Sequence, residues 1–210
     1  MKLCEFLECE KGMLFVVSGP SGTGKGTICK KVIENIGADI SVSMTTRKPR
    51  DGEIDGKDYF FVTEEEFVQT IKDKGFLEHA NVFGNRYGTP KANILEKLNS
   101  GKDVILEIDV QGAVQIKETF PEAVLIFALP PTMKELRRRI IKRGTETKQK
   151  INERLAKSID EVKFINRYDY AVINANLEIA VSEVESILIA EHLRLKSDIN
   201  KIITKYEEEC

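Results

Sequence analysis

The chain has 210 residues, of which 41% are hydrophobic and 31% charged, and its formal net charge at pH 7 is −2. This is the composition of a globular protein with enough apolar residues for a full core, and the length allows one or two domains. The nearly balanced charge gives no overall reason to expect a nucleic-acid binder, and no apolar run is long enough to span a membrane.

The amino terminus carries Glu5, Glu8 and Glu10 and lacks an apolar stretch of signal-peptide length. The four cysteines, at positions 4, 9, 29 and 210, are scattered without the spacing of metal ligands. Reduced thiols are therefore expected. Both features predict a cytoplasmic protein.

Short apolar runs alternate with segments of helical periodicity along most of the chain. Buried parallel strands are predicted for the runs 13–17, 104–108, 124–129 and 170–173. Helices are predicted for 28–36, 90–99, 111–118, 133–142 and 148–165. This alternation predicts an α/β fold whose core is a doubly wound parallel sheet.

Residues 41–89 differ from this pattern, because they are rich in turn residues and aromatics, with one helix expected near 64–73. We expect this segment to form a mainly β lobe inserted into the core. The tail from 177 to 208 is predicted to form one or two amphipathic helices without evident chemistry. Packing or self-association is the default role for such a tail.

A glycine-rich segment follows the first predicted strand and leads into the first predicted helix. Its residues are Gly19, Pro20, Ser21, Gly22, Thr23, Gly24, Lys25, Gly26 and Thr27. The glycines let the backbone curl so that several N–H groups point at one anion, and the helix amino terminus adds partial positive charge. Lys25 can then reach the β- and γ-phosphates of a nucleoside triphosphate. The segment is therefore predicted to be a phosphate-binding loop.

This loop departs from the usual pattern at one position. Gly26 stands where a Ser or Thr hydroxyl normally ligates Mg²⁺. Because Mg²⁺ keeps most of its waters and is held largely by phosphates, the change weakens one metal contact without abolishing the site. A turn that merely joins a strand to a helix is the alternative. It is disfavoured because Lys25 at a helix start opposes the helix dipole unless an anion is bound.

Further motifs occur in order along the chain. They are 41–50 (SVSMTTRKPR), 52–53 (GE), 56–59 (GKDY), 77–80 (LEHA), 87–89 (YGT), 106–112 (LEIDVQG) and 143–147 (RGTET). Together with the glycine-rich loop they closely resemble the guanylate kinase family, from about residue 13 to 190. The resemblance implies Mg²⁺-dependent phosphoryl transfer from ATP to GMP or dGMP, with these nucleotides as small-molecule partners.

The resemblance assigns the reading of guanine to Glu78 and Ser43, with Thr89 close to the base. A carboxylate accepts hydrogen bonds from the N1–H and N2–H₂ groups of guanine together, and a hydroxyl donates to O6, whereas adenine has a lone pair at N1. A site built around such bonds can reject the wrong base by about 10⁴-fold. Without the flanking motifs, Glu78 would be interpreted as a surface carboxylate.

Other residues are implied to hold the acceptor phosphate and the metal. The GMP side is completed by Arg47, Arg50, Tyr59, Tyr87, Glu107 and Asp109. Asp109, which we place at the end of the second long strand, also has a possible contact to Mg²⁺ through water, and no residue is assigned as a direct metal ligand. For the two tyrosines, aromatic packing in a β lobe is the alternative.

The catalytic residues implied by the resemblance are Lys25, Arg50, Arg139, Arg143 and Arg154. Arginines that approach the moving phosphoryl group neutralise the charge spread over its oxygens in the transition state. No general base is needed, since the attacking phosphate oxygen is already ionised near pH 7. A nucleic-acid patch is the alternative interpretation of the basic stretch 134–143.

The resemblance divides a single predicted domain, 1–210, into three parts. These are a core (1–40, 90–132 and 158–210), a GMP-binding lobe (41–89) and a lid (133–157). A guanylate-kinase-like scaffold that binds peptides and a kinase of another mononucleotide are the alternatives. The intact Gly24-Lys25 argues against the scaffold, and the pair of Glu78 and Ser43 argues against another base. We expect no nucleic-acid or membrane partner, and the choice between monomer and homo-oligomer stays open.

Overall fold

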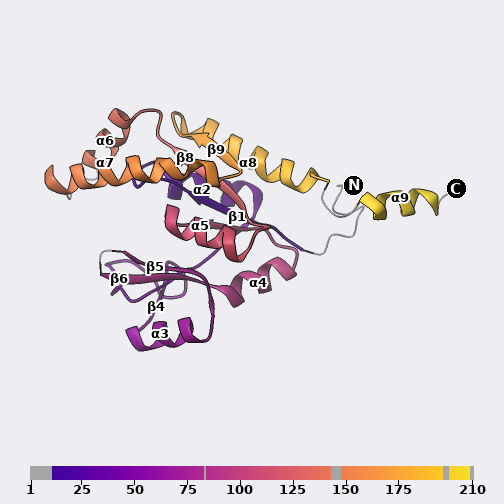
Figure 1. Ribbon diagram of the computed structural model, residues 1–210, viewed down its shortest axis with the longest axis horizontal. Helices are drawn as coiled ribbons and strands as arrows, with labels where there is room; N and C mark the ends of the chain where they lie inside the picture. Colours follow the sequence, from indigo (N-terminus) through magenta and orange to yellow (C-terminus); the bar gives the residue numbers. More distant parts are fainter. Residues whose placement is uncertain (1–10, 83, 143–147, 196–198, 209–210) are drawn as a thin grey trace.

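The computed structural model describes residues 11–82, 84–142, 148–195 and 199–208. Two sheets organise this part of the chain (Figure 1). Helices cover both faces of the larger sheet, and the smaller sheet forms a lobe beside it together with helix α3 (Glu64–Lys72).

The larger sheet is parallel and has the strand order β2-β7-β1-β8-β9. Its strands are β1 (Leu14–Ser18), β2 (Asp39–Ile40), β7 (Val104–Glu107), β8 (Val124–Leu129) and β9 (Tyr170–Ile173). The four long strands match the predicted ones, and the predicted α/β fold is confirmed. The prediction missed β2, because two residues are too few to show a periodic pattern.

Helices cover the two faces of this sheet in pairs. They are α2 (Lys25–Ile36) and α8 (Leu177–Leu193) on one face, and α4 (Lys91–Asn99) and α5 (Val110–Thr119) on the other. Phe15 and Val17 of the central strand pack toward α2 and α8, whereas Leu14 and Val16 pack toward α4 and α5. Burial on both faces explains why the central strands are continuous apolar runs.

The smaller sheet has the order β4-β3-β6-β5 and is the mainly β lobe expected from the sequence. Its strands are β3 (Met44–Thr45), β4 (Phe60–Phe61), β5 (Phe76–Val82) and β6 (Asn85–Pro90). Helix α3 begins with a capping box, in which Thr63 accepts from the Glu66 N–H and Glu66 accepts from the Thr63 N–H. Phe67 of this helix stacks on Phe76 of β5, which attaches the helix to the sheet.

Helices α6 (Met133–Lys142) and α7 (Lys148–Val162) occupy the segment predicted as a lid, 133–157, and α7 continues beyond it into the predicted core. Leu136, Ile140 and Ile151 pack together between them. The helix predicted to run to residue 165 ends at Val162 and continues as a 3₁₀ turn, η1 (Lys163–Arg167). Arg143, assigned as catalytic from the sequence, lies outside the described residues.

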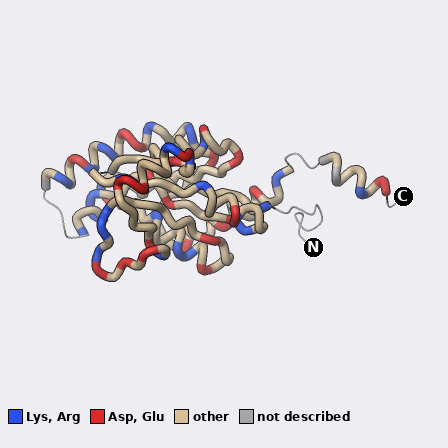
Figure 2. The backbone as a smooth tube through the Cα atoms, turned by 90° about the horizontal axis from the view of Figure 1, so that it is seen from below, with Lys and Arg blue, Asp and Glu red and all other residues tan. Residues whose placement is uncertain are grey.

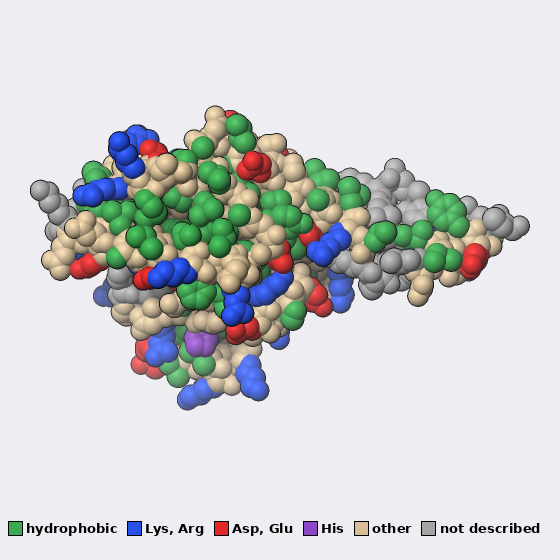
Figure 3. Space-filling model, turned by 45° about the horizontal axis from the view of Figure 1, so that its top comes forward, with side chains coloured by type: hydrophobic (Ala, Val, Ile, Leu, Met, Phe, Trp, Pro, Cys, Tyr) green, Lys and Arg blue, Asp and Glu red, His purple; other side chains and the backbone are tan. Residues whose placement is uncertain are grey.

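The carboxy-terminal tail corrects one prediction. Helix α8 is apolar around most of its circumference, since Ile179, Ile189 and Leu193 are 57–60% exposed while its opposite face is buried, so the predicted amphipathic pattern is wrong there. Apolar side chains gather on the surface seen in Figure 3. Helix α9 (Ile199–Glu207) lies apart from both sheets in two perpendicular views (Figures 1 and 2).

Two further observations concern the described residues alone. None of their helices combines the length and the hydropathy that crossing a bilayer requires. Cys29, the cysteine that falls among them, is free and buried in the core beside α8. Burial raises the pKa of its thiol to about 12, so it is an unreactive packing residue.

Candidate active site

A cavity of about 370 Å³ lies between the glycine-rich loop, the β lobe and helix α7. The predicted site residues that line it are Gly19, Ser21, Gly22, Gly24, Lys25, Gly26, Ser43, Tyr59, Glu78, Tyr87, Glu107, Asp109 and Arg154. The phosphate loop and the predicted guanine-reading residues therefore face one common space.

The other predicted site residues that the structure describes do not line the cavity. Pro20 and Thr23 are buried within the loop, Thr27 is exposed on α2, and Thr89 lies behind Glu78. The remaining residues among those described are the arginines at positions 47, 50 and 139, and the first and last of these make the contacts given below. Arg50 is exposed, and its backbone N–H donates to Glu53.

Two glycines determine the path of the loop. Gly19 has φ +136°, and a Cβ there would lie 2.3 Å from the carbonyl oxygen of Ala128. Gly24 has φ +93°, and a Cβ there would lie 2.5 Å from Nδ2 of Asn174. No other residue fits either position. Gly24 is also the N-cap of α2 and makes no side-chain cap, so the first N–H groups of this helix are available to an anion.

Lys25 lies over the loop. Its Nζ donates to the carbonyl oxygens of Gly19 at 2.7 Å and Pro20 at 3.1 Å. Burial lowers the pKa of this ammonium, and the nearby Glu107 carboxylate is the strongest opposing influence. A partly buried ammonium held by neutral carbonyls gains charged partners when phosphate binds.

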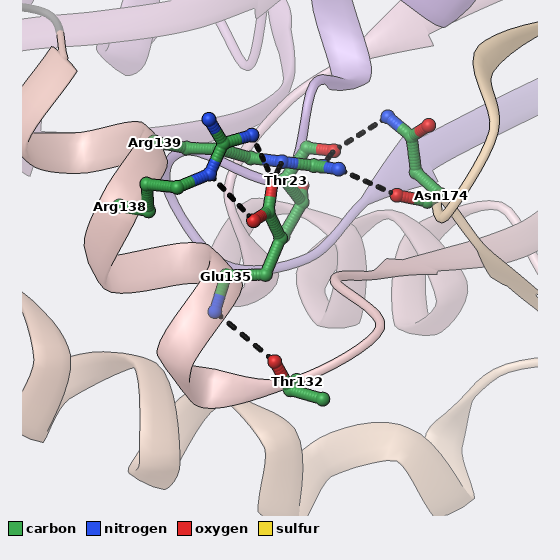
Figure 4. A network of polar contacts seen from close by, with 6 residues as sticks. All are labelled: Thr23, Thr132, Glu135, Arg138, Arg139 and Asn174. Atoms are coloured by element: carbon green, nitrogen blue, oxygen red, sulfur yellow. Dashed lines mark hydrogen bonds and ion pairs between the residues drawn. The ribbon is translucent and has the colours of Figure 1, made fainter.

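Arg139 of α6 supports the loop from behind (Figure 4). Its guanidinium donates to the carbonyl oxygens of Thr23 at 3.2 Å and Asn174 at 2.9 Å, and its Nε donates to Glu135. Asn174 Nδ2 donates to the same Thr23 oxygen at 2.8 Å. Hydrogen bonds from Arg138 and Arg139 lower the pKa of Glu135 to about 2. Arg139 thus connects α6, the loop and the end of β9 instead of lining the cavity.

Glu78 of β5 is a buried carboxylate at the cavity wall, 6% exposed. Thr89, its partner on β6, donates to Oε1 at 2.6 Å. Burial raises the pKa of Glu78 to about 7, although the Thr89 hydrogen bond acts in the opposite direction. Its Oε2 faces α5, where a Cβ at Gly112 would lie 2.8 Å away, so the glycine leaves room for the carboxylate. Such a fixed carboxylate can accept paired N–H groups from a flat base.

A cluster of phenol and guanidinium groups also lies in the lobe. The rings of Tyr59 and Tyr87 are 6.0 Å apart, and both line the cavity. Arg47 lies over the Tyr59 ring and donates two hydrogen bonds of 2.9 Å to Glu53. This ion pair raises the pKa of Arg47 and lowers that of Glu53. The cluster presents donors suited to phosphate oxygens.

The structure changes the predicted position of Asp109. Strand β7 ends at Glu107, and Asp109 is the N-cap of α5, where its Oδ1 accepts from the Gly112 N–H at 2.9 Å. Both carboxylates nevertheless line the cavity, because the carboxyl ends of neighbouring parallel strands meet at one edge of the sheet.

Helix α7 contributes cavity residues that the sequence analysis missed. Lys157, Ser158 and Glu161 line the cavity together with Arg154. Their spacing from Arg154 is three, four and seven residues, which is one face of a helix, so this periodicity could have found them. Lys157 Nζ lies 3.7 Å from Glu161, and burial raises the pKa of that carboxyl.

The parallel sheet, the glycine-rich loop before α2 and the attached β lobe define a phosphate-loop kinase. A family model described as guanylate kinase matches residues 11–191. Guanylate kinases from Clostridium tetani and Clostridioides difficile are 51% and 50% identical, over 94% and 95% of this chain and 95% and 98% of theirs. The crystal structure of guanylate kinase from Anaplasma phagocytophilum superposes with a TM-score of 0.75 at 34% identity, covering 92% of this chain and 94% of that one.

The chain therefore belongs to the guanylate kinase family, which confirms the predicted resemblance. The enzyme class predicted from the sequence, an ATP-dependent nucleoside monophosphate kinase, is that of this family.

Proposed function

We propose that this protein catalyses the Mg²⁺-dependent transfer of the γ-phosphoryl group of ATP to GMP or dGMP, giving ADP and GDP or dGDP. The shared cavity carries the proposal, because it joins Lys25 and the phosphate loop to Ser43 and Glu78. A donor triphosphate and a purine monophosphate can thus meet in one space.

The phosphate loop is the proposed site of the ATP phosphates. Its backbone N–H groups and the free amino terminus of α2 supply positive potential, and Lys25 supplies a full charge. Mg²⁺ bound with ATP would neutralise charge on the phosphate oxygens. The hard oxygen donors of Glu107 and Asp109 at the same edge fit this ion.

The guanine base is proposed to lie against Glu78. The ionised carboxylate accepts from N1–H and N2–H₂, Thr89 keeps the carboxylate oriented, and Ser43 donates to O6. Adenine would leave Glu78 buried and without a proton to accept, and this mismatch costs about 1–3 kcal/mol or more.

The acceptor phosphate is proposed to lie beside Tyr59 and Tyr87, with Arg47 and Arg50 as the cations. One of its ionised oxygens forms a bond to the γ-phosphorus of ATP while the bond from that phosphorus to the β–γ bridging oxygen breaks, and ADP leaves. Arg154 on α7 faces the same cavity and would neutralise the transferred group. We propose the same task for Arg143, and for Arg139 the positioning of the loop.

Steady-state assays with GMP, dGMP, AMP, UMP and CMP as acceptors test the proposal. ADP formation should require Mg²⁺ and should be fast with GMP and slow with the non-guanine nucleotides. Turnover of AMP at a rate comparable to that of GMP would overturn the assignment of Glu78. Calorimetric titration with ATP tests the scaffold alternative, since absent or millimolar binding would favour a peptide-binding domain.

A further inference from the structure

Gly26, in the first turn of α2, has no conformational reason to be glycine. Its φ lies outside the left-handed range found at Gly19, Gly22 and Gly24. A Cβ at this position would lie 2.9 Å from Oε2 and 3.6 Å from Oε1 of Glu107. The glycine therefore provides space, and a carboxylate lies at the edge of that space.

Glu107 extends from the end of β7 into the cavity. It is exposed, and it lines the same wall as Lys25 and Gly26. In most phosphate loops a Ser or Thr side chain projects from the position of Gly26, and its hydroxyl binds Mg²⁺. Because that hydroxyl is one bond beyond the Cβ, the Glu107 carboxylate stands next to the place the hydroxyl would occupy.

The charge of Glu107 is partly balanced by the nearby Lys25 ammonium, whose pKa it raises. Once a nucleotide is bound, Lys25 gains phosphate oxygens as partners, and Glu107 needs a further counterion. A carboxylate beside a phosphate site is repelled by phosphate oxygens unless a cation lies between them. Mg²⁺ is commonly held by one or two carboxylates together with substrate phosphates and several waters. Glutamate has one more methylene than aspartate, which lets the carboxylate reach across to the first turn of α2.

We propose that Glu107 and Gly26 act as a pair, in which the Glu107 carboxylate supplies the contact to hydrated Mg²⁺ that the missing hydroxyl supplies in other phosphate loops. This assigns Glu107 to the ATP side instead of the GMP side. The inference rests on the proposed function, from which the metal is taken.

Calorimetric titration with a non-hydrolysable ATP analogue, with and without Mg²⁺, tests the pair without measuring turnover. The readout is the ratio of the Kd without metal to the Kd with metal. Glu107→Gln is expected to lower this ratio by about tenfold or more, which is typical when a group that orients a metal is lost. Binding of the analogue without Mg²⁺, and binding of GMP, should not weaken.

Glu118→Gln is the control, because it makes the same substitution on the exposed surface of α5, outside the lining of the cavity. This variant is expected to keep the wild-type ratio. A second substitution in the Glu107→Gln variant tests the role of the hydroxyl. Gly26→Ser adds a hydroxyl and should restore most of the wild-type ratio. Gly26→Ala adds only the Cβ and should not restore it. Circular dichroism melting establishes that each variant is folded.

An unchanged ratio in Glu107→Gln, or an equal loss in Glu118→Gln, would overturn the inference. Weaker GMP binding with an unchanged ratio would also overturn it and would place Glu107 on the GMP side. If wild-type protein binds the analogue equally with and without Mg²⁺ and turns over without the metal, the metal requirement of the proposed function fails, and this inference fails with it.

Discussion

Two walls of the cavity, on the ATP side and on the GMP side, are built in opposite ways. The donor wall is one continuous segment, 19–27, which runs from the end of β1 into the first turn of α2, and it acts mainly through backbone groups. The guanine wall is assembled from side chains far apart in the chain, since Ser43, Glu78 and Thr89 meet only because β3, β5 and β6 pair. A buried carboxylate lies at its centre.

This difference has an energetic meaning. The phosphate loop directly follows β1, whose residues are at most 1% exposed. This packed core keeps the loop in its shape before any nucleotide binds. The guanine wall instead pays for its specificity, because an ionised Glu78 is desolvated until a base donates to it. Removing the two kinds of group should therefore have separable effects.

Lys25→Ala should break the donor wall alone and have the largest effect. We expect kcat to fall by about 10²- to 10³-fold, because a charge that stabilises the transferring phosphates is lost. GMP affinity should persist, since Glu78 and the two tyrosines are untouched. A coupled assay and a GMP titration measure the two quantities. Loss of GMP binding in a folded variant would contradict the separation of the walls.

The pH dependence of stability tests the buried carboxylate. The folded pKa of Glu78, about 7, lies above its ordinary value of 4.5, so the folded state binds more protons between these values. Its contribution to stability is present below pH 4.5 and is lost as the pH rises to 7, by roughly 3 kcal/mol at most. The difference in unfolding free energy between wild type and Glu78→Gln should therefore vary with pH across this window. A difference that stays constant between pH 4.5 and pH 7 would contradict a raised pKa for Glu78.

Glu78→Gln should break the guanine wall alone. We expect GMP binding to weaken by about 1–3 kcal/mol, because the amide replaces an ionised acceptor of two N–H groups. ATP affinity should not change. Glu65→Gln, on the exposed face of α3 in the same lobe, is the control and should bind GMP as wild type does. Unchanged GMP affinity in Glu78→Gln would mean that the base is read elsewhere.

Thr63→Ala is expected to have the smallest effect of these variants, and it tests whether the lobe and the phosphate loop are independent. Loss of the α3 capping box should destabilise the protein by about 1 kcal/mol, measured by thermal melting. Since α3 packs on β5 of the lobe, ATP affinity should stay constant. An ATP titration of the variant measures this, and a weakened Kd would show that the two walls are coupled through the lobe.

Much of the fold could be predicted because it depends on consecutive residues. The apolar runs became β1, β7, β8 and β9, and the helical segments became α2 and α4 to α7, with no end shifted by more than three residues. Two errors share a physical cause. Asp109 was placed at a strand end but caps α5, and α8 was expected to have one apolar face but has two. In both cases the outcome depends on what packs beside the residue.

The residues of the candidate site also divide into those that the local sequence predicts and those that it does not. The sequence by itself determined the phosphate loop, since glycine conformations, a following helix and Lys25 are all local features. Only the tertiary structure decided that Arg139 holds the loop from behind and that Glu78 is buried against Thr89 with a raised pKa. Desolvation and hydrogen bonds between distant residues arise only when the chain is packed, and no local pattern records them.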